Sequence, residues 1–105
     1  MSNSRDIPSC SVVIPAFNAE RWIRHAINSV LVQTHPLRQV VVVDDGSTDR
    51  TADLLGIFGD RVLVVRQNNQ GVASARNAGA ALTDSTHLAF LDADDVWESD
   101  KIALQ

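Results

Sequence analysis

The sequence predicts an α/β protein in which a parallel sheet is built in the order β-α-β-α-β-α-β. Short apolar runs alternate with segments of helical periodicity along the 105 residues, which is typical of a parallel sheet with helices on its faces. No hairpin signal such as Asn-Gly joins two apolar runs. Polar and acidic clusters follow the apolar runs, and open parallel sheets bind ligands at the carboxyl ends of their strands. We therefore expect one α/β unit with a ligand site at that edge.

The first strand and the first helix follow a polar start of the chain. Residues 11–15 form an apolar run that ends at Pro15, which cannot donate to a neighbouring strand, and they predict a buried strand. A helix is predicted from about residue 20 to residue 33, because apolar residues recur there at three- and four-residue spacing. These residues are Trp22, Ile23, Ala26, Ile27, Val30 and Leu31. Pro36 lies beyond the end of this helix.

A second strand is predicted at residues 39–44. It contains four consecutive valines, and a continuous β-branched run of this kind is typical of a strand buried on both faces. Gly46 suits the turn that follows. Ser47 or Thr48 is expected to cap the next helix, since both residue types are favoured at helix N-termini.

The rest of the chain continues the alternation. The second helix is expected to end at Gly59, because glycine is favoured just after a helix C-terminus. A third strand is predicted at residues 61–65, an alanine-rich helix at about residues 72–82, and a fourth strand at residues 87–91. A last helix is expected to begin near Glu98.

Length and composition predict one globular domain, residues 10–105, after a polar tail at residues 1–9. The net charge of −4 argues against general nucleic-acid binding. The single cysteine, Cys10, cannot form an intramolecular disulfide and fits a reducing compartment. No apolar run approaches the ~20 residues of a membrane span, and the first residues lack the apolar core of a signal peptide. We therefore expect a cytoplasmic protein, either free or peripheral to the inner face of the membrane.

Two acidic clusters follow predicted strands and form the strongest functional signal. Asp44 ends the second strand and Asp45 follows it, and Asp92, Asp94 and Asp95 follow the fourth. Carboxylates this close repel one another unless a cation or a proton compensates their charge. The clusters therefore either cap helices in solvated turns or hold a divalent cation such as Mg²⁺ or Mn²⁺, which prefers oxygen ligands.

The sequence lacks the glycine-rich phosphate loops of other nucleotide-binding proteins. Neither Gly-x-Gly-x-x-Gly nor Gly-x-x-x-x-Gly-Lys occurs. If the ligand carries phosphates, they must be held in another way, and a divalent cation on carboxylates is the means that the sequence offers. The three histidines have no zinc-binding spacing.

Four consecutive segments of the chain resemble motifs of the family 2 glycosyltransferases of GT-A fold. They are SVVIPAFNAERWIRHAINSVLVQT, VVVVDDGSTD, NNQGVASARNAG and FLDADDVWESDK. The resemblance runs from about Cys10 to Gln105, and four segments in this order are far more specific than a lone Asp-x-Asp. It implies the nucleotide-binding half of a GT-A fold, with a Rossmann-like sheet of strand order 3-2-1-4.

The resemblance also implies roles for individual residues at the nucleoside. Pro15 and Phe17 would line the nucleobase pocket, and Asp45 would bind the base through a ring nitrogen. Glu20 and Asp44 are further nucleotide-binding candidates, although a carboxylate near a helix N-terminus explains Glu20 equally well.

For the diphosphate, the resemblance implies a metal site of Mn²⁺ or Mg²⁺. Asp92 and Asp94 match the Asp-x-Asp element, in which Asp94 would coordinate the metal bridging the phosphates of a nucleotide-diphosphate sugar, with a UDP-sugar favoured. Asp92 would reach the ribose directly or through water, or would join the metal. Arg76 matches the Ala-Arg-Asn segment, and two roles remain open for it: facing the phosphates, or tying its helix to the acidic loops.

The chain also departs from the family pattern. Members normally continue beyond Asp-x-Asp into a second half that builds the acceptor site and carries the general base. Here the chain ends eleven residues after Asp94. The catalytic base is therefore unknown, and sugar transfer by these 105 residues alone is not expected.

Three other interpretations are compatible with parts of the sequence. The protein could bind nucleotide or assemble with another chain without catalysis. The segment FLDADDV also fits a phosphatase of the haloacid dehalogenase type, but three predicted strands precede it. A receiver-like module would need an acidic pair after the first strand, where this chain has Pro-Ala-Phe-Asn.

Self-association is expected at the fourth strand. Residues 87–91 are apolar apart from His87, and they contain no lysine or proline to discourage pairing at a sheet edge. Without a further strand beside it, this edge would pair with another molecule, most simply in a two-fold homo-oligomer that buries the region from His87 to Phe90.

Overall fold

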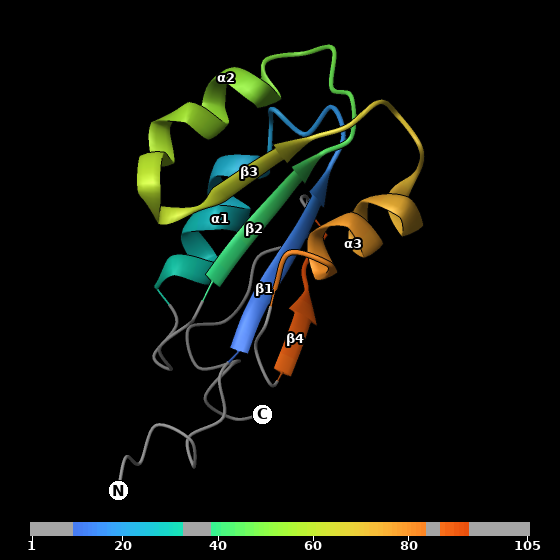
Figure 1. The fold of residues 1–105 in the computed structure, drawn as a ribbon. Coiled ribbons are helices and arrows are strands. Elements are labelled where there is room, and N and C mark those ends of the chain that lie inside the picture. Colours follow the sequence, from blue (N-terminus) through green and yellow to red (C-terminus); the bar gives the residue numbers. More distant parts are fainter. Residues whose placement is uncertain (1–9, 33–38, 84–86, 93–105) are drawn as a thin grey trace, which may run out of the picture.

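Four parallel strands form the centre of the computed structural model, which describes residues 10–32, 39–83 and 87–92 (Figure 1). The strands are β1 (Cys10–Ala16), β2 (Gln39–Asp44), β3 (Leu63–Arg66) and β4 (His87–Phe90). The helices are α1 (Ile23–Leu31), α2 (Thr51–Leu55), the 3₁₀ helix η2 (Gly56–Arg61) and α3 (Val72–Ala80). The strand order is β3-β2-β1-β4, so the predicted order 3-2-1-4 is confirmed.

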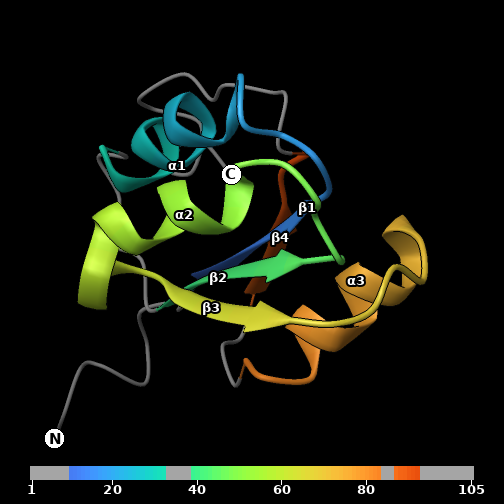
Figure 2. The ribbon, with the colours of Figure 1, turned by 90° about the horizontal axis from the view of Figure 1, so that it is seen from above.

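The sheet lies between two helical layers. Figure 2 shows α1 and α2 on one face of the sheet and α3 on the other. The two faces pack differently, because successive side chains of a strand point to opposite sides. Val12 and Ile14 of β1 belong to the larger core with α1, whereas Val13 packs with Ala75 of α3.

The central strands have the burial expected from their sequences. Every residue of β1 is buried, and the four valines of β2 are buried as well. The register aligns Val13 of β1 with Val41 of β2 and with Phe90 of β4. The continuous apolar runs therefore did identify strands that are covered on both faces.

Gly79 lets α3 lie close to the sheet. A Cβ atom at this position would overlap Cγ1 of Val13 and come within 3.1 Å of Cγ2 of Val43. The alanine-rich composition of α3 serves the same close packing, because its buried face consists of Ala75 and Gly79.

Helix α1 begins later than predicted. It starts at Ile23 instead of about residue 20, and the backbone N–H groups of Ala19 and Glu20 are bonded to side chains of the loop between β2 and α2. A turn leads into the helix, in which the carbonyl of Ala19 accepts the N–H groups of Trp22 and Ile23. The predicted end at residue 33 lies outside the described residues.

The expected cap of the second helix was wrong. Helix α2 begins at Thr51 with Arg50 at its N-cap, and no side chain caps it there. Ser47 and Thr48 lie earlier in the loop, where they are bonded to Asn18. Gly59 has a φ of 55°, and the chain leaves helical geometry at this residue, close to where the helix was expected to end.

The other boundaries differ from the predictions by one or two residues. The third strand is displaced to Leu63–Arg66, because Arg61 still belongs to η2. Helix α3 and strand β4 each end slightly earlier than expected, and the helix predicted near Glu98 lies outside the described residues. None of the helices in the described part of the chain is long and apolar enough to cross a membrane.

Candidate functional site

The candidate site lies at the carboxyl ends of the strands. All four strands run in the same direction, so the loops after β1, β2 and β3 meet at one edge of the sheet (Figure 1). The last residues of three strands are aligned: Ala16 of β1 opposite Asp44 of β2, and Asp44 opposite Arg66 of β3. The acidic clusters were predicted to share this edge, and the structure places Asp44, Asp45 and Asp92 there.

The Asp45 carboxylate holds the loop between β3 and α3. Its Oδ1 accepts hydrogen bonds from Nε2 of Gln67 at 2.8 Å and from the backbone N–H of Gln70 at 2.9 Å. Its Oδ2 accepts the backbone N–H of Gly71, the residue before α3, at 3.0 Å. Burial by itself would raise the pKa of the Asp45 carboxyl, but these hydrogen bonds bring the pKa below its ordinary value. Asp45 is therefore a carboxylate at neutral pH and acts only as an acceptor.

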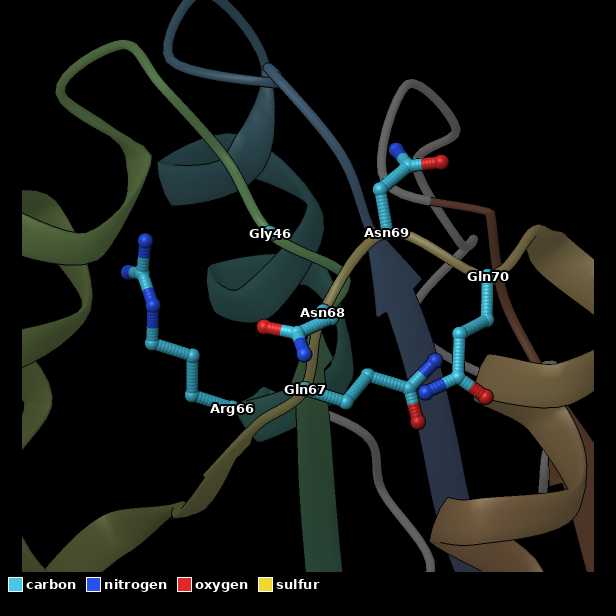
Figure 3. A pocket seen from close by; sticks show the side chains of 6 residues that line it. All are labelled: Gly46, Arg66, Gln67, Asn68, Asn69 and Gln70. Carbon is cyan, nitrogen blue, oxygen red and sulfur yellow. The ribbon is translucent and has the colours of Figure 1, made fainter.

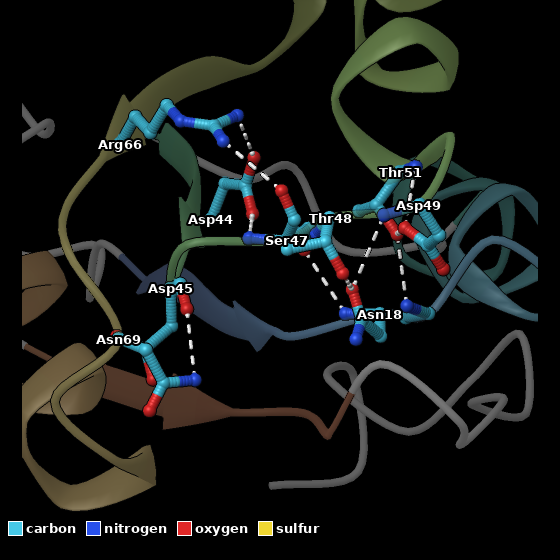
Figure 4. Close-up of polar contacts among 10 residues, drawn as sticks. Asn18, Asp44, Asp45, Ser47, Thr48, Asp49, Thr51, Arg66 and Asn69 are labelled. Carbon is cyan, nitrogen blue, oxygen red and sulfur yellow. Dashed lines mark hydrogen bonds and ion pairs between the residues drawn. The ribbon is translucent and has the colours of Figure 1, made fainter.

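The neighbouring Asp44 points to the other side and is engaged within the protein. Its buried carboxylate pairs with Nη1 of Arg66 at 2.9 Å and accepts the backbone N–H of Ser47 at 3.0 Å. Arg66 also donates from Nη2 to the Ser47 carbonyl at 3.0 Å (Figure 4). These contacts favour a structural role for Asp44, which ties the turn after β2 to the end of β3.

Phe17 presents an exposed aromatic ring at this edge. It follows β1 directly, and 48% of its surface is accessible. Pro15 is buried within β1, opposite Val43 of β2. Of the two residues predicted to line a nucleobase pocket, Phe17 thus presents its surface at the edge, while Pro15 contributes to the sheet beneath it.

Glu20 lies beside the start of α2. Its Oε1 accepts the backbone N–H of Arg50 at 3.5 Å, and its own N–H donates to Oδ2 of Asp49 at 3.3 Å. Burial tends to raise the pKa of Asp49, but hydrogen bonds from the side chain and backbone of Thr51 and from Glu20 lower it overall. Glu20 and Asp49 thus join two loops, and the carboxylate of Glu20 is associated with α2 instead of α1.

Arg76 of α3 contacts the end of β4. Its Nη2 lies 3.1 Å from Oδ1 of Asp92, and its guanidinium carbon lies 5.9 Å from the centre of the Phe90 ring. Both charged side chains are half-exposed, so the pair contributes little to stability. This pair ties the helix to the acidic loop, and a role of Arg76 at the phosphates stays a prediction.

The predicted metal site is only partly described. Asp92 stands at the carboxyl end of β4 with an exposed carboxylate, whereas Asp94 and Asp95 lie outside the described residues. Among residues 10–32, 39–83 and 87–92, no group of three or more His, Cys, Asp or Glu side chains is arranged to hold a metal ion.

A polar cavity of about 590 Å³ adjoins the Asp45 loop. It is lined by Gly46 and by residues 66–70, which include four consecutive carboxamides. Figure 3 shows Gln67 and Gln70 pointing towards each other while Arg66 points to the opposite side. Gly46, with a φ of 77°, permits the close approach of the loop, because a Cβ atom there would lie 2.7 Å from the backbone nitrogen of Asn69.

Sequence reasoning missed several residues that shape this edge. Gln67 and Asn18 were not singled out, yet Gln67 bonds Asp45 and Asn18 bonds the loop after β2. The sequence did contain a signal for both residues. Each is an amide residue within two positions of the end of an apolar strand, where its side chain can form hydrogen bonds with backbone groups of a loop.

The comparison with protein families is decisive. Residues 11–105 match the model for Glycosyl transferase family 2. The chain belongs to this family. The GT-A glycosyltransferase fold implied by the four sequence motifs is therefore confirmed, and the phosphatase and receiver-like interpretations lose their support.

Individual members resemble the chain over most of its length. An uncharacterized glycosyltransferase of Nostoc sp. is 45% identical over 96 residues, which is 88% of this chain and 30% of that protein. The crystal structure of residues 1–349 of S. aureus TarS in complex with UDP has a TM-score of 0.76 at 26% identity, covering 90% of this chain and 30% of that TarS chain. The mannosyltransferase PcManGT from Pyrobaculum calidifontis, in complex with GDP-Man and Mn²⁺, has a TM-score of 0.84 at 28% identity. This match covers 91% of the present chain and 30% of PcManGT, so the chain spans less than a third of each of these proteins.

Proposed function

We propose that the chain binds the nucleotide part of a nucleotide-diphosphate sugar, with a UDP-sugar favoured, in a glycosyltransferase that transfers the sugar to an acceptor. The observation that carries this proposal is the Asp45 carboxylate, held by three hydrogen bonds at the edge of the sheet where the exposed Phe17 follows β1. The ligands in the complexes of two similar structures, UDP in TarS and GDP-Man with Mn²⁺ in PcManGT, support it.

Asp45 is suited to select the base. A carboxylate offers about four acceptor positions, and three of them are used by Gln67, Gln70 and Gly71. One position on Oδ2 remains for a ligand. Uracil and guanine present a ring N–H at neutral pH, whereas the corresponding ring nitrogens of cytosine and adenine are acceptors. An ionised Asp45 therefore favours uracil or guanine and rejects cytosine and adenine, because two facing acceptors leave a buried group unpaired.

Phe17 supplies the matching apolar surface. Its half-exposed ring can stack on a base, and base–aromatic stacking is worth about 1–3 kcal/mol irrespective of the base. Phe17 thus contributes affinity for any nucleoside, and Asp45 provides specificity for the base.

The diphosphate requires positive charge, and Asp92 fits a divalent cation. Magnesium and manganese are commonly held by one or two carboxylates together with substrate phosphates, so Asp94, joined by the half-exposed Asp92, would hold the cation. A bound Mn²⁺ or Mg²⁺ would neutralise the charge that develops on the leaving nucleoside diphosphate. Arg76 pairs with Asp92 and places a further positive charge beside it.

Titration calorimetry with UDP, GDP, CDP and ADP tests the proposal. With Mn²⁺ present, UDP or GDP should bind at least about tenfold more tightly than CDP and ADP, which corresponds to about 1.4 kcal/mol. Asp45→Asn should remove most of this difference, while Asp60→Asn, the same change at an exposed position, should not. Equal binding of all four nucleotides by the unaltered protein would contradict the assignment of Asp45.

A further inference from the structure

We propose that Asn18 is a positioning residue of the nucleoside pocket, which sets Phe17 against Asp45 by locking the loop between β1 and α1 onto the loop between β2 and α2. The inference rests on the proposed nucleotide binding. As a positioning residue, Asn18 would contact neither the base nor the phosphates. It acts through the backbone on either side of Phe17.

The backbone of Asn18 is the first observation. Its φ is 48°, and among the described residues no other non-glycine residue has a positive φ. Asparagine tolerates this left-handed conformation better than most residues, whereas alanine rarely adopts it. The reversal at Asn18 turns the chain from the end of β1 towards α1.

The side chain of Asn18 bonds the opposite loop (Figure 4). Its Oδ1 accepts the backbone N–H groups of Thr48 at 2.8 Å and Asp49 at 3.3 Å, and also the hydroxyl of Thr48 at 3.4 Å. In return, the backbone N–H of Asn18 donates to Oγ of Ser47 at 3.0 Å. One carboxamide thus satisfies donors of residues about thirty positions away, just before α2 begins.

Contacts on both sides of Asn18 also join the two loops. Together with the bonds of Asn18 itself, they form what we call the Asn18 junction. The carbonyl of Ala16 accepts the backbone N–H of Asp45 at 2.8 Å. Beyond Asn18, the N–H of Ala19 donates to Oγ1 of Thr51 at 2.8 Å. The two loops are therefore bonded at Asn18 and on both sides of it.

This arrangement determines where Phe17 lies. Its two neighbours, Ala16 and Asn18, are both bonded to the loop that begins with Asp45. The Phe17 ring is half-exposed, so core packing does not hold it, and its place depends on the backbone. The distance between the stacking surface and the base-selecting carboxylate is therefore set by the Asn18 junction.

Three variants of Asn18 separate its contributions. Asn18→Gly keeps the positive φ and loses the carboxamide, and Asn18→Ala loses both. Asn18→Asp keeps an acceptor oxygen and tolerates the same φ. Ser47→Ala weakens the junction from the other loop, and Asn28→Ala, on the exposed side of α1, serves as a control.

Two measurements are required on each folded variant. Amide hydrogen exchange at Thr48 and Asp49 reports the junction directly. Calorimetry with UDP and with inorganic pyrophosphate, both with Mn²⁺, separates the nucleoside part of the site from the phosphate part. We expect Asn18→Gly to exchange these amides about tenfold faster and to bind UDP about tenfold more weakly, as loss of one or two hydrogen bonds implies, with unchanged pyrophosphate binding. Asn18→Asp should retain the slow exchange, and Ser47→Ala should show a smaller loss of UDP binding.

Two results would overturn the inference. The first is wild-type exchange and UDP affinity in Asn18→Gly. The second is an equal loss of UDP and pyrophosphate, because it would show only a general weakening of the fold. Failure of the unaltered protein to bind UDP or GDP would instead refute the proposed function, and the exchange rates would still decide whether Asn18 locks the loops.

Discussion

The Oδ2 atom of Asp45 accepts the backbone N–H of Gly71 at 3.0 Å, so the residue after β2 holds the residue before α3. This contact brings together two segments that are 26 positions apart and fixes the first turn of α3 above the sheet edge. The carboxylate is stable there because backbone and side-chain donors replace the water that burial removes. Its charge is thus part of the fold as well as of the proposed base recognition.

Acid should weaken the protein through this carboxylate. The pKa of Asp45 is below its ordinary value in the folded state, so the unfolded chain binds the proton more readily. The stabilisation is complete above the unfolded pKa of about 3.9 and is lost as the pH falls through the lower folded pKa. Urea unfolding from about pH 7 to about pH 2.5 should show the stability difference between wild type and Asp45→Asn shrinking towards low pH. A stability difference between the two proteins that stays constant over this pH range would contradict the lowered pKa of Asp45.

Gly46→Ala should destabilise the protein by about 2 kcal/mol, from the left-handed backbone and from the clash with the backbone nitrogen of Asn69. Gly56→Ala is the matched control, because it has a helical backbone and no atom within 4 Å of a new Cβ. This control should be neutral or stabilising by up to about 1 kcal/mol. Chemical unfolding of both variants measures the effect, and equal stabilities would rule out the close approach at Gly46.

Metal dependence should disappear in Asp94→Ala. If Asp94 holds the cation at the diphosphate, UDP binding by this variant should be the same with Mn²⁺ and with excess chelator. Asp100→Ala removes the same charge a few residues further along and should keep the metal dependence. Calorimetry distinguishes the two, and a normal metal response in Asp94→Ala would remove this residue from the site.

Self-association at β4 stays a prediction that the structure sharpens. In the described part of the chain β4 pairs with β1 alone, and Leu88 and Phe90 are 39% and 43% exposed. Because Phe90 also lies beside Arg76, Leu88→Lys is the cleaner variant. Light scattering should show an oligomer that Leu88→Lys dissociates, whereas Leu63→Lys on the opposite edge strand should not. A wild-type monomer at micromolar concentration would contradict the prediction.

The local pattern of the sequence was enough to determine the strands, the helices and the edge at which the polar residues gather. The four consecutive valines of β2 can all be buried only in a strand that is covered on both faces. In the structure all four are buried. The apolar spacing of α1 likewise identified Ile23, Ala26, Ile27 and Val30 as buried residues. These features depend on near neighbours in the chain, whose spacing a sequence displays directly.

The contacts between loops were decided by the tertiary structure. Asp44 and Asp45 are adjacent and chemically identical, yet one pairs with Arg66 of β3 and the other holds Gly71 before α3, because successive side chains point to opposite faces. The bonds of Asn18 to Thr48 likewise depend on a loop that the chain reaches about thirty residues later. Backbone groups of a loop take whichever partner the fold brings near, and that partner is absent from any local pattern.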